Sequence, residues 1–426
     1  MFALYSILLF FALLIYLPLY SFRIKVLRRE KLHLGQRMGF GLPRRSPGRP
    51  GIWIHAVSVG EVLSLQSLIQ KLKSRHPGWE VWFSTLTESG FKVAREKITL
   101  ADRLFFLPLD FGWIVRRFLR AVEPDLLILA ESEFWPNLLR ETKKRGVPVL
   151  SINGRISSSS FGTYRRLRSL GLKLLSLVDL YLVQTEQDKE KFVALRLPPE
   201  RIQVSGNLKT EVHLPEYSGA AIADLKKSLN IPDGRKIVVA GSTRKGEEEI
   251  LLRAFQAARK TRPDLSLIVA PRQPQRFREV ERLCQSTGFR VDRRTERSRN
   301  GSWDILILDT IGELAQAYAL CDVAFIGGSL VSWGGHNLLE PAYYRKPVFF
   351  GPHMHNFAFL AERFLQAGGA RTAHEGEELV DMFLMKDERR LEVMGKKARE
   401  VLDSLHGATE RTILAIESMI GQGKGH

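Results

Sequence analysis

Residues 52–61 read IWIHAVSVGE, and this stretch decides the fold class. The mainly apolar run from Ile52 to Val57 predicts a buried strand, and the small residues that follow it predict a turn. An amphipathic stretch from Gly60 to Arg75 then predicts a helix. Strand, turn and helix in this order begin a βαβ unit, from which parallel sheets are built.

The same order recurs along the chain and predicts an α/β protein with two doubly wound, Rossmann-like domains. Helical stretches such as 111–122 and 247–260 separate the strands. The predicted strands are Ile52–Val57, Glu80–Ser84, Arg103–Leu107, Leu126–Ala130, Val149–Ile152, Leu180–Val183 and Gln203–Gly206, and in a second series Lys236–Ala240, Ser266–Val269, Asp304–Leu308, Val323–Ile326 and Pro347–Phe349.

The break between the two series sets the domain boundaries. Residues 213–231 contain Pro215, a Ser-Gly pair and a short polar helix, and we interpret them as a linker. The N-terminal domain is then expected over residues 51–212. The C-terminal domain is expected over residues 232–426, ending in a helix, with the arginine-rich stretch 290–302 as a surface loop.

Residues 1–22, MFALYSILLFFALLIYLPLYSF, carry no charged side chain. A helix of this length, at about 1.5 Å per residue, measures about 33 Å and is long enough to cross a bilayer. We expect a retained N-terminal transmembrane anchor. A cleaved signal peptide and a buried core helix are the alternatives, and the former normally has a basic start and a small-residue cleavage site, which are missing here.

The net charge of +18, from 64 Lys+Arg against 46 Asp+Glu, points to an acidic partner. Residues 23–50 form a basic juxtamembrane segment, because nine basic residues stand against Glu30 between Arg23 and Arg49. The positive-inside rule places this segment, and the chain after it, on the cytoplasmic side of the membrane. Each basic residue near an anionic lipid surface contributes about 1 kcal/mol of attraction.

Neither a metal site nor nucleic-acid binding is expected. The two cysteines, Cys284 and Cys321, form no Cys-x-x-Cys pair and fit a reducing compartment. His353 and His355 have His-x-His spacing, but no third ligand is evident. The basic series Arg165, Arg166, Arg168 and Lys173 beside Tyr164 is interpreted as a solvated or membrane-facing helix face rather than a nucleic-acid surface.

Charged residues follow several predicted strands of the first series, at the edge where open α/β sheets bind ligands. Glu61 falls in a first helical turn, where the helix dipole favours the ionised carboxylate that a general base needs. A plain helix-start carboxylate is the alternative. Glu131 and Glu133 follow the strand 126–130 and share a side if the chain there is extended. Lys209 follows Gly206 and can reach a phosphate or a developing negative charge.

The second series carries signals for a nucleotide site. Gly241 and Ser242 lie between a strand and a helix start, where backbone N–H groups bind anions. Pro271-Arg272 and Gly312-Glu313-Leu314 follow further strands. A helix that began near His336 would place Asn337 and Glu340 on one face, for phosphate and ribose respectively. Their joint occurrence on successive strand ends predicts nucleotide binding.

The motifs HAVSVGE, ESEFWPN, NGRIS, GNLK, GSTRKGEEE, APR, IGEL, GGS and HNLLEP, in this order, closely resemble those of the 3-deoxy-D-manno-octulosonic acid (Kdo) transferases. The resemblance covers about residues 1–415. It implies a GT-B glycosyltransferase with two facing Rossmann-like domains, located at the cytoplasmic face of the inner membrane. It further implies CMP-Kdo as the donor, the lipid A precursor lipid IVA as the acceptor, and no cofactor.

The resemblance also assigns residues. It implies that Glu61 is the proton acceptor and that Glu131 and Lys209 stabilise the transition state, in an inverting reaction without a metal. The implied contacts of the cytidine nucleotide are Pro271, Arg272, Gly312, Glu313, Leu314, Asn337, Leu338, Leu339 and Glu340, and Gly241 and Ser242 are expected to join them.

Three other classes of protein stay open. A membrane-anchored GT-B enzyme that uses a UDP-sugar would share the architecture. A GT-B-like sugar epimerase would need no anchor. A nucleic-acid binder would explain the charge, but it predicts basic–aromatic stripes in a known module, which the sequence lacks.

Overall fold

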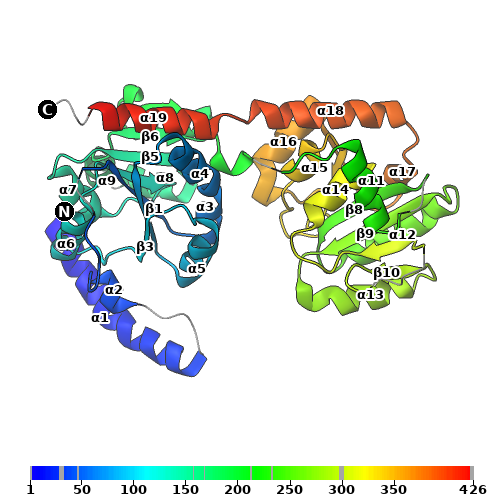
Figure 1. Cartoon of the computed structure of the whole chain (residues 1–426), viewed down its shortest axis with the longest axis horizontal. Coiled ribbons are helices and arrows are strands. Elements are labelled where there is room, and N and C mark those ends of the chain that lie inside the picture. The colour runs from blue at the N-terminus through cyan, green and yellow to red at the C-terminus, as the bar shows by residue number, and fades with distance from the viewer. Residues whose placement is uncertain are drawn as a thin grey trace. The chain divides into compact units, whose positions relative to one another are not determined.

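The computed structural model describes residues 2–27, 33–45, 48–156, 158–166, 168–211, 214–231, 234–296 and 302–422. The chain forms two compact units. The first unit comprises Met1–Glu211 together with His406–His426, and the second comprises Val212–Leu405. Figure 1 labels their helices and strands.

The first unit contains a seven-stranded parallel sheet in the order β3-β2-β1-β4-β5-β6-β7. Its strands are β1 (Gly51–Ala56), β2 (Glu80–Thr85), β3 (Arg103–Phe106), β4 (Leu126–Ala130), β5 (Val149–Gly154), β6 (Leu180–Val183) and β7 (Ile202–Val204). Its helices are α1 (Phe2–Leu27), α2 (Leu34–Arg37), α3 (Val59–Ser64), α4 (Gln66–Arg75), α5 (Glu88–Lys97), α6 (Gly112–Val122), α7 (Pro136–Lys143), α8 (Ser158–Arg166), α9 (Arg168–Leu175), α10 (Glu186–Ala194) and α19 (Ala408–Gln422), with the short 3-10 helices η1 (Pro199–Arg201) and η2 (Leu208–Thr210).

The second unit contains another seven-stranded parallel sheet, in the order β10-β11-β9-β8-β12-β13-β14. Its strands are β8 (Lys236–Thr243), β9 (Leu265–Pro271), β10 (Val291–Arg293), β11 (Ile305–Ile307), β12 (Val323–Ile326), β13 (Val348–Phe350) and β14 (Ala370–Thr372). Its helices are α11 (Gly219–Ser228), α12 (Glu247–Arg259), α13 (Phe277–Gln285), α14 (Leu314–Leu320), α15 (Leu339–Tyr343), α16 (Ala358–Ala367), α17 (Glu377–Leu384) and α18 (Glu388–Ser404), with η3 (Pro274–Arg276) and η4 (His355–Phe357).

Two parallel-sheet α/β units confirm the predicted fold class. The central strands are mainly apolar because helices cover both faces of each sheet. Strand β4 is fully buried along its length, and its alternate side chains enter the two separate cores of the first unit. In each sheet the order in which successive strands are added reverses beside the first strand, between β1 and β4 and between β8 and β12, while all strands stay parallel. The carboxyl ends at such a switch point are where open α/β sheets bind ligands.

Three details differ from the prediction. The expected helix 60–75 is two helices, α3 and α4, which meet at Leu65. Strands β10 and β14 were not predicted, and both are short edge strands that contain an arginine. The stretch 290–302, expected to be a surface loop, therefore begins with a strand that pairs with β11, while residues 297–301 lie outside the described part of the chain.

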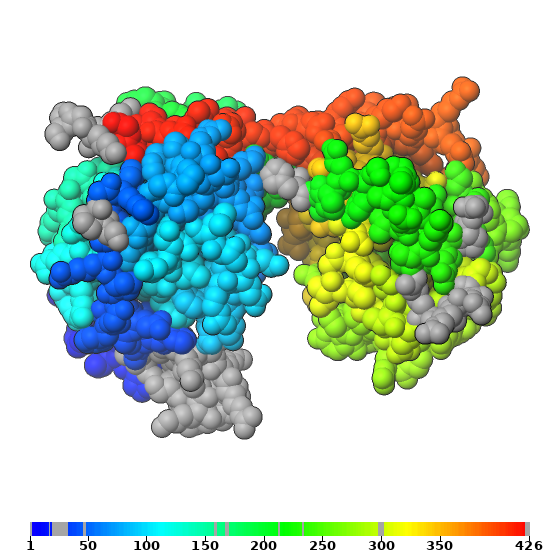
Figure 2. All heavy atoms as spheres, viewed as in Figure 1, coloured from blue at the N-terminus to red at the C-terminus, as the bar shows by residue number. Residues whose placement is uncertain are grey.

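The predicted domain boundary also differs. Residues 406–426 belong to the first unit, not to the C-terminal domain expected over 232–426. Helix α19, red in Figure 2, covers part of the first unit, where Arg75 and His76 pair with Glu417. Helix α11, within the predicted linker 213–231, packs against α14 of the second unit. Residue 213 lies outside the described part of the chain.

Helix α1 carries the apolar N-terminal segment. Its first turns contact α7, because Asn137 Nδ2 donates a hydrogen bond to Ser6 Oγ at 3.0 Å and the Arg140 guanidinium lies 5.0 Å from the centre of the Phe2 ring. Large apolar side chains farther along α1, such as Phe11, are exposed. Among the described residues, no helix combines the length and apolarity that a membrane crossing requires. The predicted transmembrane helix is therefore not confirmed, and part of the basic segment, 28–32 and 46–47, lies outside the described residues.

Candidate active site

Glu61 lies in the first turn of α3, directly after β1, and is 7% exposed. Ser58 is the N-cap of this helix and forms a reciprocal capping box with Glu61. The Ser58 hydroxyl donates to Glu61 Oε1 at 2.7 Å, the Val57 N–H donates to Oε2 at 2.8 Å, and the Ser58 N–H lies 3.3 Å from Oε1. These donors fix the carboxylate in one orientation. Both alternatives from the sequence, a cap and a base, fit this geometry.

Glu131 follows β4, the strand next to β1, and pairs with Lys209 of η2. Lys209 Nζ lies 2.5 Å from Glu131 Oε1. Glu131 has φ of 57°, a left-handed conformation that non-glycine residues adopt rarely and that concentrates at functional sites. Glu131 and Glu133 were expected to share a side if the chain were extended, and this condition is not met because the chain turns at Glu131.

Buried polar groups hold this ion pair in place. Asn153, at the end of β5, has φ of 55° and is 1% exposed. Its Oδ1 accepts a hydrogen bond from the Leu208 N–H at 3.0 Å, one residue before Lys209. The Ser151 hydroxyl donates to the Glu131 carbonyl at 3.0 Å. The position of Lys209 therefore depends on Asn153, which the NGRIS motif contained but which sequence reasoning did not assign to the site.

Glu133 interacts electrostatically with both Glu61 and Glu131. Burial, together with the negative charges of Glu61 and Glu131, raises the pKa of Glu133 to about 7. Carboxylates influence one another in this way when they lie close together. The carboxyl ends of β1 and β4 therefore bring together the three predicted catalytic residues, with Glu133 as an additional acid that can hold a proton near neutral pH.

The second unit has a pocket of about 750 Å³ at the carboxyl ends of its strands. It gathers seven of the predicted nucleotide contacts, Ser242, Pro271, Arg272, Gly312, Leu314, Asn337 and Glu340. The sequence did not predict the aromatic side chains of Phe277, Tyr318 and Phe357, which also line it. A pocket of this size with aromatic walls and a few polar groups suits a small ligand such as a nucleotide.

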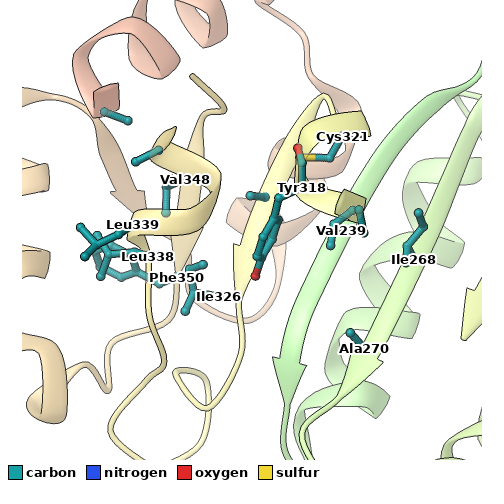
Figure 3. Close-up of a cluster of buried hydrophobic side chains, with 14 of the residues drawn as sticks. Val239, Ile268, Ala270, Tyr318, Cys321, Ile326, Leu338, Leu339, Val348 and Phe350 are labelled. Carbon is teal, nitrogen blue, oxygen red and sulfur yellow. The ribbon is translucent and has the colours of Figure 1, made fainter. Parts of the chain in front are cut away.

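Four predicted contacts do not line this pocket. Leu338 and Leu339 are buried and, as Figure 3 shows, point into the hydrophobic core near Ile326 and Phe350. A Cβ at Gly241 would lie 1.9 Å from the Tyr318 hydroxyl oxygen, so the glycine allows this ring to approach β8. The fourth, Glu313, is bound by side chains of its own unit, as described below. Two leucines inside a motif could not be assigned to core or pocket from spacing alone.

The positive charge of the pocket comes from two arginines. Arg272 lines it, and Arg244 lies beside it with its guanidinium 4.6 Å from the centre of the Trp333 ring. Burial, together with the positive charges of Arg244 and Arg272, lowers the pKa of His336 to about 4. The imidazole is therefore neutral near pH 7, and Arg244 Nε donates to His336 Nε2 at 3.2 Å. Such a site favours an anionic ligand.

Backbone amides contribute differently from what the sequence predicted. The Arg244, Ser329 and Leu330 N–H groups donate to the buried Glu247 carboxylate at 2.8–2.9 Å, and Gly328 donates to it as well. These amides of the α12 start and the GGS loop are therefore engaged within the protein. Helix α15 begins at Leu339 rather than near His336. Asn337 still lines the pocket, and its Oδ1 accepts from the Leu339 N–H at 3.1 Å.

Within the described part of the chain, no group of three or more His, Cys, Asp or Glu side chains could hold a metal ion. His353 and His355 thus gain no third ligand there. Both cysteines are buried and unpaired, and burial raises the pKa of each thiol to about 12. Thiolate chemistry at neutral pH is not expected from either.

The sequence of this chain is similar to those of known transferases. Residues 32–212 match the family described as 3-Deoxy-D-manno-octulosonic-acid transferase (kdotransferase). The 3-deoxy-D-manno-octulosonic acid transferase of Haemophilus influenzae is 33% identical over 392 residues, which cover 90% of this chain and 91% of that protein. The enzyme of the same name from Chlamydia pneumoniae is 32% identical over 425 residues, 98% of this chain and 96% of that one.

The similarity of this chain to solved structures of low sequence identity concerns its fold alone. UDP-GlcNAc 2-epimerase from Neisseria meningitidis, bound to UDP-GlcNAc, aligns over 86% of this chain and 100% of its own length, with a TM-score of 0.58 and 12% identity. Its similarity supports a two-domain α/β architecture of the GT-B type.

Proposed function

Since the chain belongs to the Kdo transferase family and is therefore a glycosyltransferase, we propose that it transfers Kdo from CMP-Kdo to lipid IVA. The observation that carries this proposal is the pocket of the second unit, which gathers residues that the family resemblance assigns to the cytidine nucleotide. Arg272 and Arg244 supply positive charge for the phosphate of the nucleotide and the carboxylate of Kdo. Charge on the leaving phosphate is stabilised there as it develops.

The proposed general base is Glu61. Two carboxylate oxygens offer about four lone-pair positions, and three donors from Val57 and Ser58 approach them. One position on Oε2 is left to accept the proton of an acceptor hydroxyl. The deprotonated oxygen attacks the anomeric carbon of Kdo, the bond to CMP breaks on the opposite face, and the configuration inverts. The reaction as proposed requires no metal ion.

Lys209 and Glu131 are proposed to stabilise the transition state. Lys209 carries the positive charge, and its pairing with Glu131 holds the ammonium group at a defined position at the carboxyl end of β4. A preorganised charge loses little energy to reorganisation when the reaction occurs. The lipid IVA acceptor is acidic and would be repelled by the carboxylates Glu61, Glu131 and Glu133. The positive charge of Lys209 reduces this repulsion.

We propose that the N-terminal segment anchors the protein to the cytoplasmic face of the inner membrane, where a lipid acceptor would be found. Residues 1–22 carry no charge, and the basic residues that follow would attract anionic lipid headgroups. Exposed apolar side chains on α1 support the proposal.

The direct test combines the purified protein with CMP-Kdo and lipid IVA and reads the product masses. Lipid IVA carrying one or more Kdo residues is the expected product. Unchanged lipid IVA, with either a UDP-sugar consumed or UDP bound more tightly than CMP in titrations, would instead identify a transferase for a UDP-sugar.

A further inference from the structure

The short edge strand β10 ends at Arg293, and Arg294 follows it directly; both arginines bind the loop on one side of the nucleotide pocket. Arg294 forms a bidentate pair with Glu313, with Nε 2.8 Å from Oε2 and Nη2 2.9 Å from Oε1. The neighbouring Arg293 pairs with Asp309 through Nη2 at 2.7 Å. Bidentate guanidinium–carboxylate pairs fix direction as well as distance.

The two acids lie on either side of pocket residues. Thr310, Ile311 and Gly312 line the pocket and stand between Asp309 and Glu313 in the sequence. Gly312 has φ of 94°, and Ile311 is 87% exposed, so little packing holds this stretch. The Thr310 hydroxyl donates to Glu313 Oε2 at 2.5 Å. The two ion pairs therefore determine where the loop lies.

Asp309 is the more buried anchor. It is 8% exposed, and the Thr295 N–H donates to Asp309 Oδ1 at 3.0 Å. Hydrogen bonds from Thr295 and the charge of Arg293 outweigh burial and lower the pKa of Asp309. The Arg294–Glu313 pair is more accessible, with side chains 23% and 27% exposed. Its loss is therefore expected to loosen the loop without unfolding the sheet.

We propose that Arg294 is a positioning residue for the donor nucleotide: through Glu313, it holds the wall Thr310–Leu314 in the conformation that binds the nucleotide. This rests on the proposed function only in that the pocket binds a nucleotide. Glu313 is thus a support of the pocket wall rather than a direct contact of the ligand. A preorganised wall improves affinity because less motion is lost on binding.

The test measures nucleotide affinity by calorimetry and transfer kinetics in the full-length protein. Arg294→Ala is expected to raise the Kd for CMP and the KM for the donor about tenfold. This is the effect of losing a bidentate charged pair, reduced because the pair is partly exposed to solvent. The value of kcat at saturating donor stays within about twofold, because the catalytic groups of the first unit are untouched. Arg294→Lys retains one charged contact with Glu313 and recovers part of the affinity.

Arg290→Ala is the matched control. Arg290 precedes β10 and pairs with Asp304 at 3.1 Å, and Asp304 keeps its ion pairs with Arg235 and Arg259 after the change. None of these residues lines the pocket, so the Kd for CMP is expected to stay at the wild-type value. Melting temperatures of both variants verify that the binding measurements concern folded protein.

A double-mutant cycle with Glu313→Gln tests whether Arg294 acts through Glu313. The Arg294→Ala change is expected to have little further effect in the Glu313→Gln background. If the wild-type protein binds CMP and Arg294→Ala binds it with the same affinity, the inference is overturned and the proposed function stands. If the wild-type protein binds UDP more tightly than CMP, the proposed donor is overturned. The Kd for UDP of the same variants then tests the inference. Binding of neither nucleotide would overturn both.

Discussion

Lys209 Nζ and Glu131 Oε1 lie 2.5 Å apart, although 78 positions separate them in the sequence. The pair joins the carboxyl end of β4 to η2, which follows the edge strand β7. Exposed ion pairs contribute little to stability, and 40% of the Lys209 side chain is exposed. The main effect of the pair is therefore expected to be on catalysis.

Lys209→Ala is expected to reduce kcat about 100-fold or more, the usual effect of removing a preorganised group that stabilises developing charge. The measurement is steady-state transfer at saturating donor. Lys143→Ala is the matched control, because Lys143 forms a comparable pair with Asp179 at 2.7 Å in the same unit. Similar rates for the two variants would rule out a catalytic role for Lys209.

Glu61→Gln is expected to abolish transfer, with at least about a 100-fold loss of kcat, because an amide cannot take a proton. CMP binding should remain at the wild-type level. The change also disrupts the capping box, which costs about 1 kcal/mol of stability.

A cap elsewhere in the same unit controls for that loss. Thr185 caps α10 by accepting a hydrogen bond from the Asp188 N–H at 3.1 Å. Thr185→Ala should cost about 1 kcal/mol as well while transfer continues. Near-normal turnover by Glu61→Gln would show that Glu61 is only a helix cap.

The raised pKa of Glu133 predicts that the stability of the protein depends on pH. Its pKa is raised from 4.5 to about 7 in the folded protein, so between these values the folded state binds more protons than the unfolded state. Its contribution therefore becomes less favourable as the pH rises from 4.5 to about 7.

Glu133→Gln is expected to raise the melting temperature at pH 8 and to change it little at pH 4. Thermal denaturation of both proteins across this range gives the comparison. An equal difference in melting temperature at every pH would contradict the raised pKa.

Removal of residues 1–22 is expected to release most of the protein from membranes. Cosedimentation with vesicles of neutral lipid, and with vesicles containing about 30% anionic lipid, gives the measurement. Residual binding of the shortened chain should require the anionic lipid and fall with added salt, because the basic residues after Phe22 act electrostatically. Equal binding of the two chains to neutral vesicles would contradict the proposed anchor.

The sequence was most informative for the buried strands. Strand β4 agrees residue for residue with its prediction because both of its faces are covered, which requires an uninterrupted apolar run. Strand β10 reads Val-Asp-Arg and is half-buried at a sheet edge, so it lacks that pattern. A three-residue edge strand with two charged side chains gives no signal that separates it from a loop.

The site was predictable as a set of strand ends but not as a geometry. Three features of the sites depend on contacts between distant parts of the chain and could not be predicted from the sequence. They are the positive φ of Glu131, the hydrogen bond that Asn153 accepts from the Leu208 N–H, and the Arg294–Glu313 pair. The start of α12 shows the limit most clearly. The strand followed by a helix start predicted N–H groups that bind an anionic ligand, whereas the Glu247 carboxylate accepts the Arg244 N–H and, in addition, those of Ser329 and Leu330. Short polar motifs indicate where ligands bind more reliably than they indicate which atoms bind them.

The return of α19 to the first unit has a consequence for biosynthesis. Ile413, Ile416 and Ile420 belong to the same buried cluster as Leu68 and Leu72. The ribosome therefore releases every residue of the second unit before this one of the two cores of the first unit can close. At roughly 5–20 residues per second, the interval is on the order of 10–40 s. During that time the nascent first unit exposes the apolar side chains that α19 later covers. A chain that stops before residue 406 keeps them exposed, so we expect chaperones and proteases to bind such fragments.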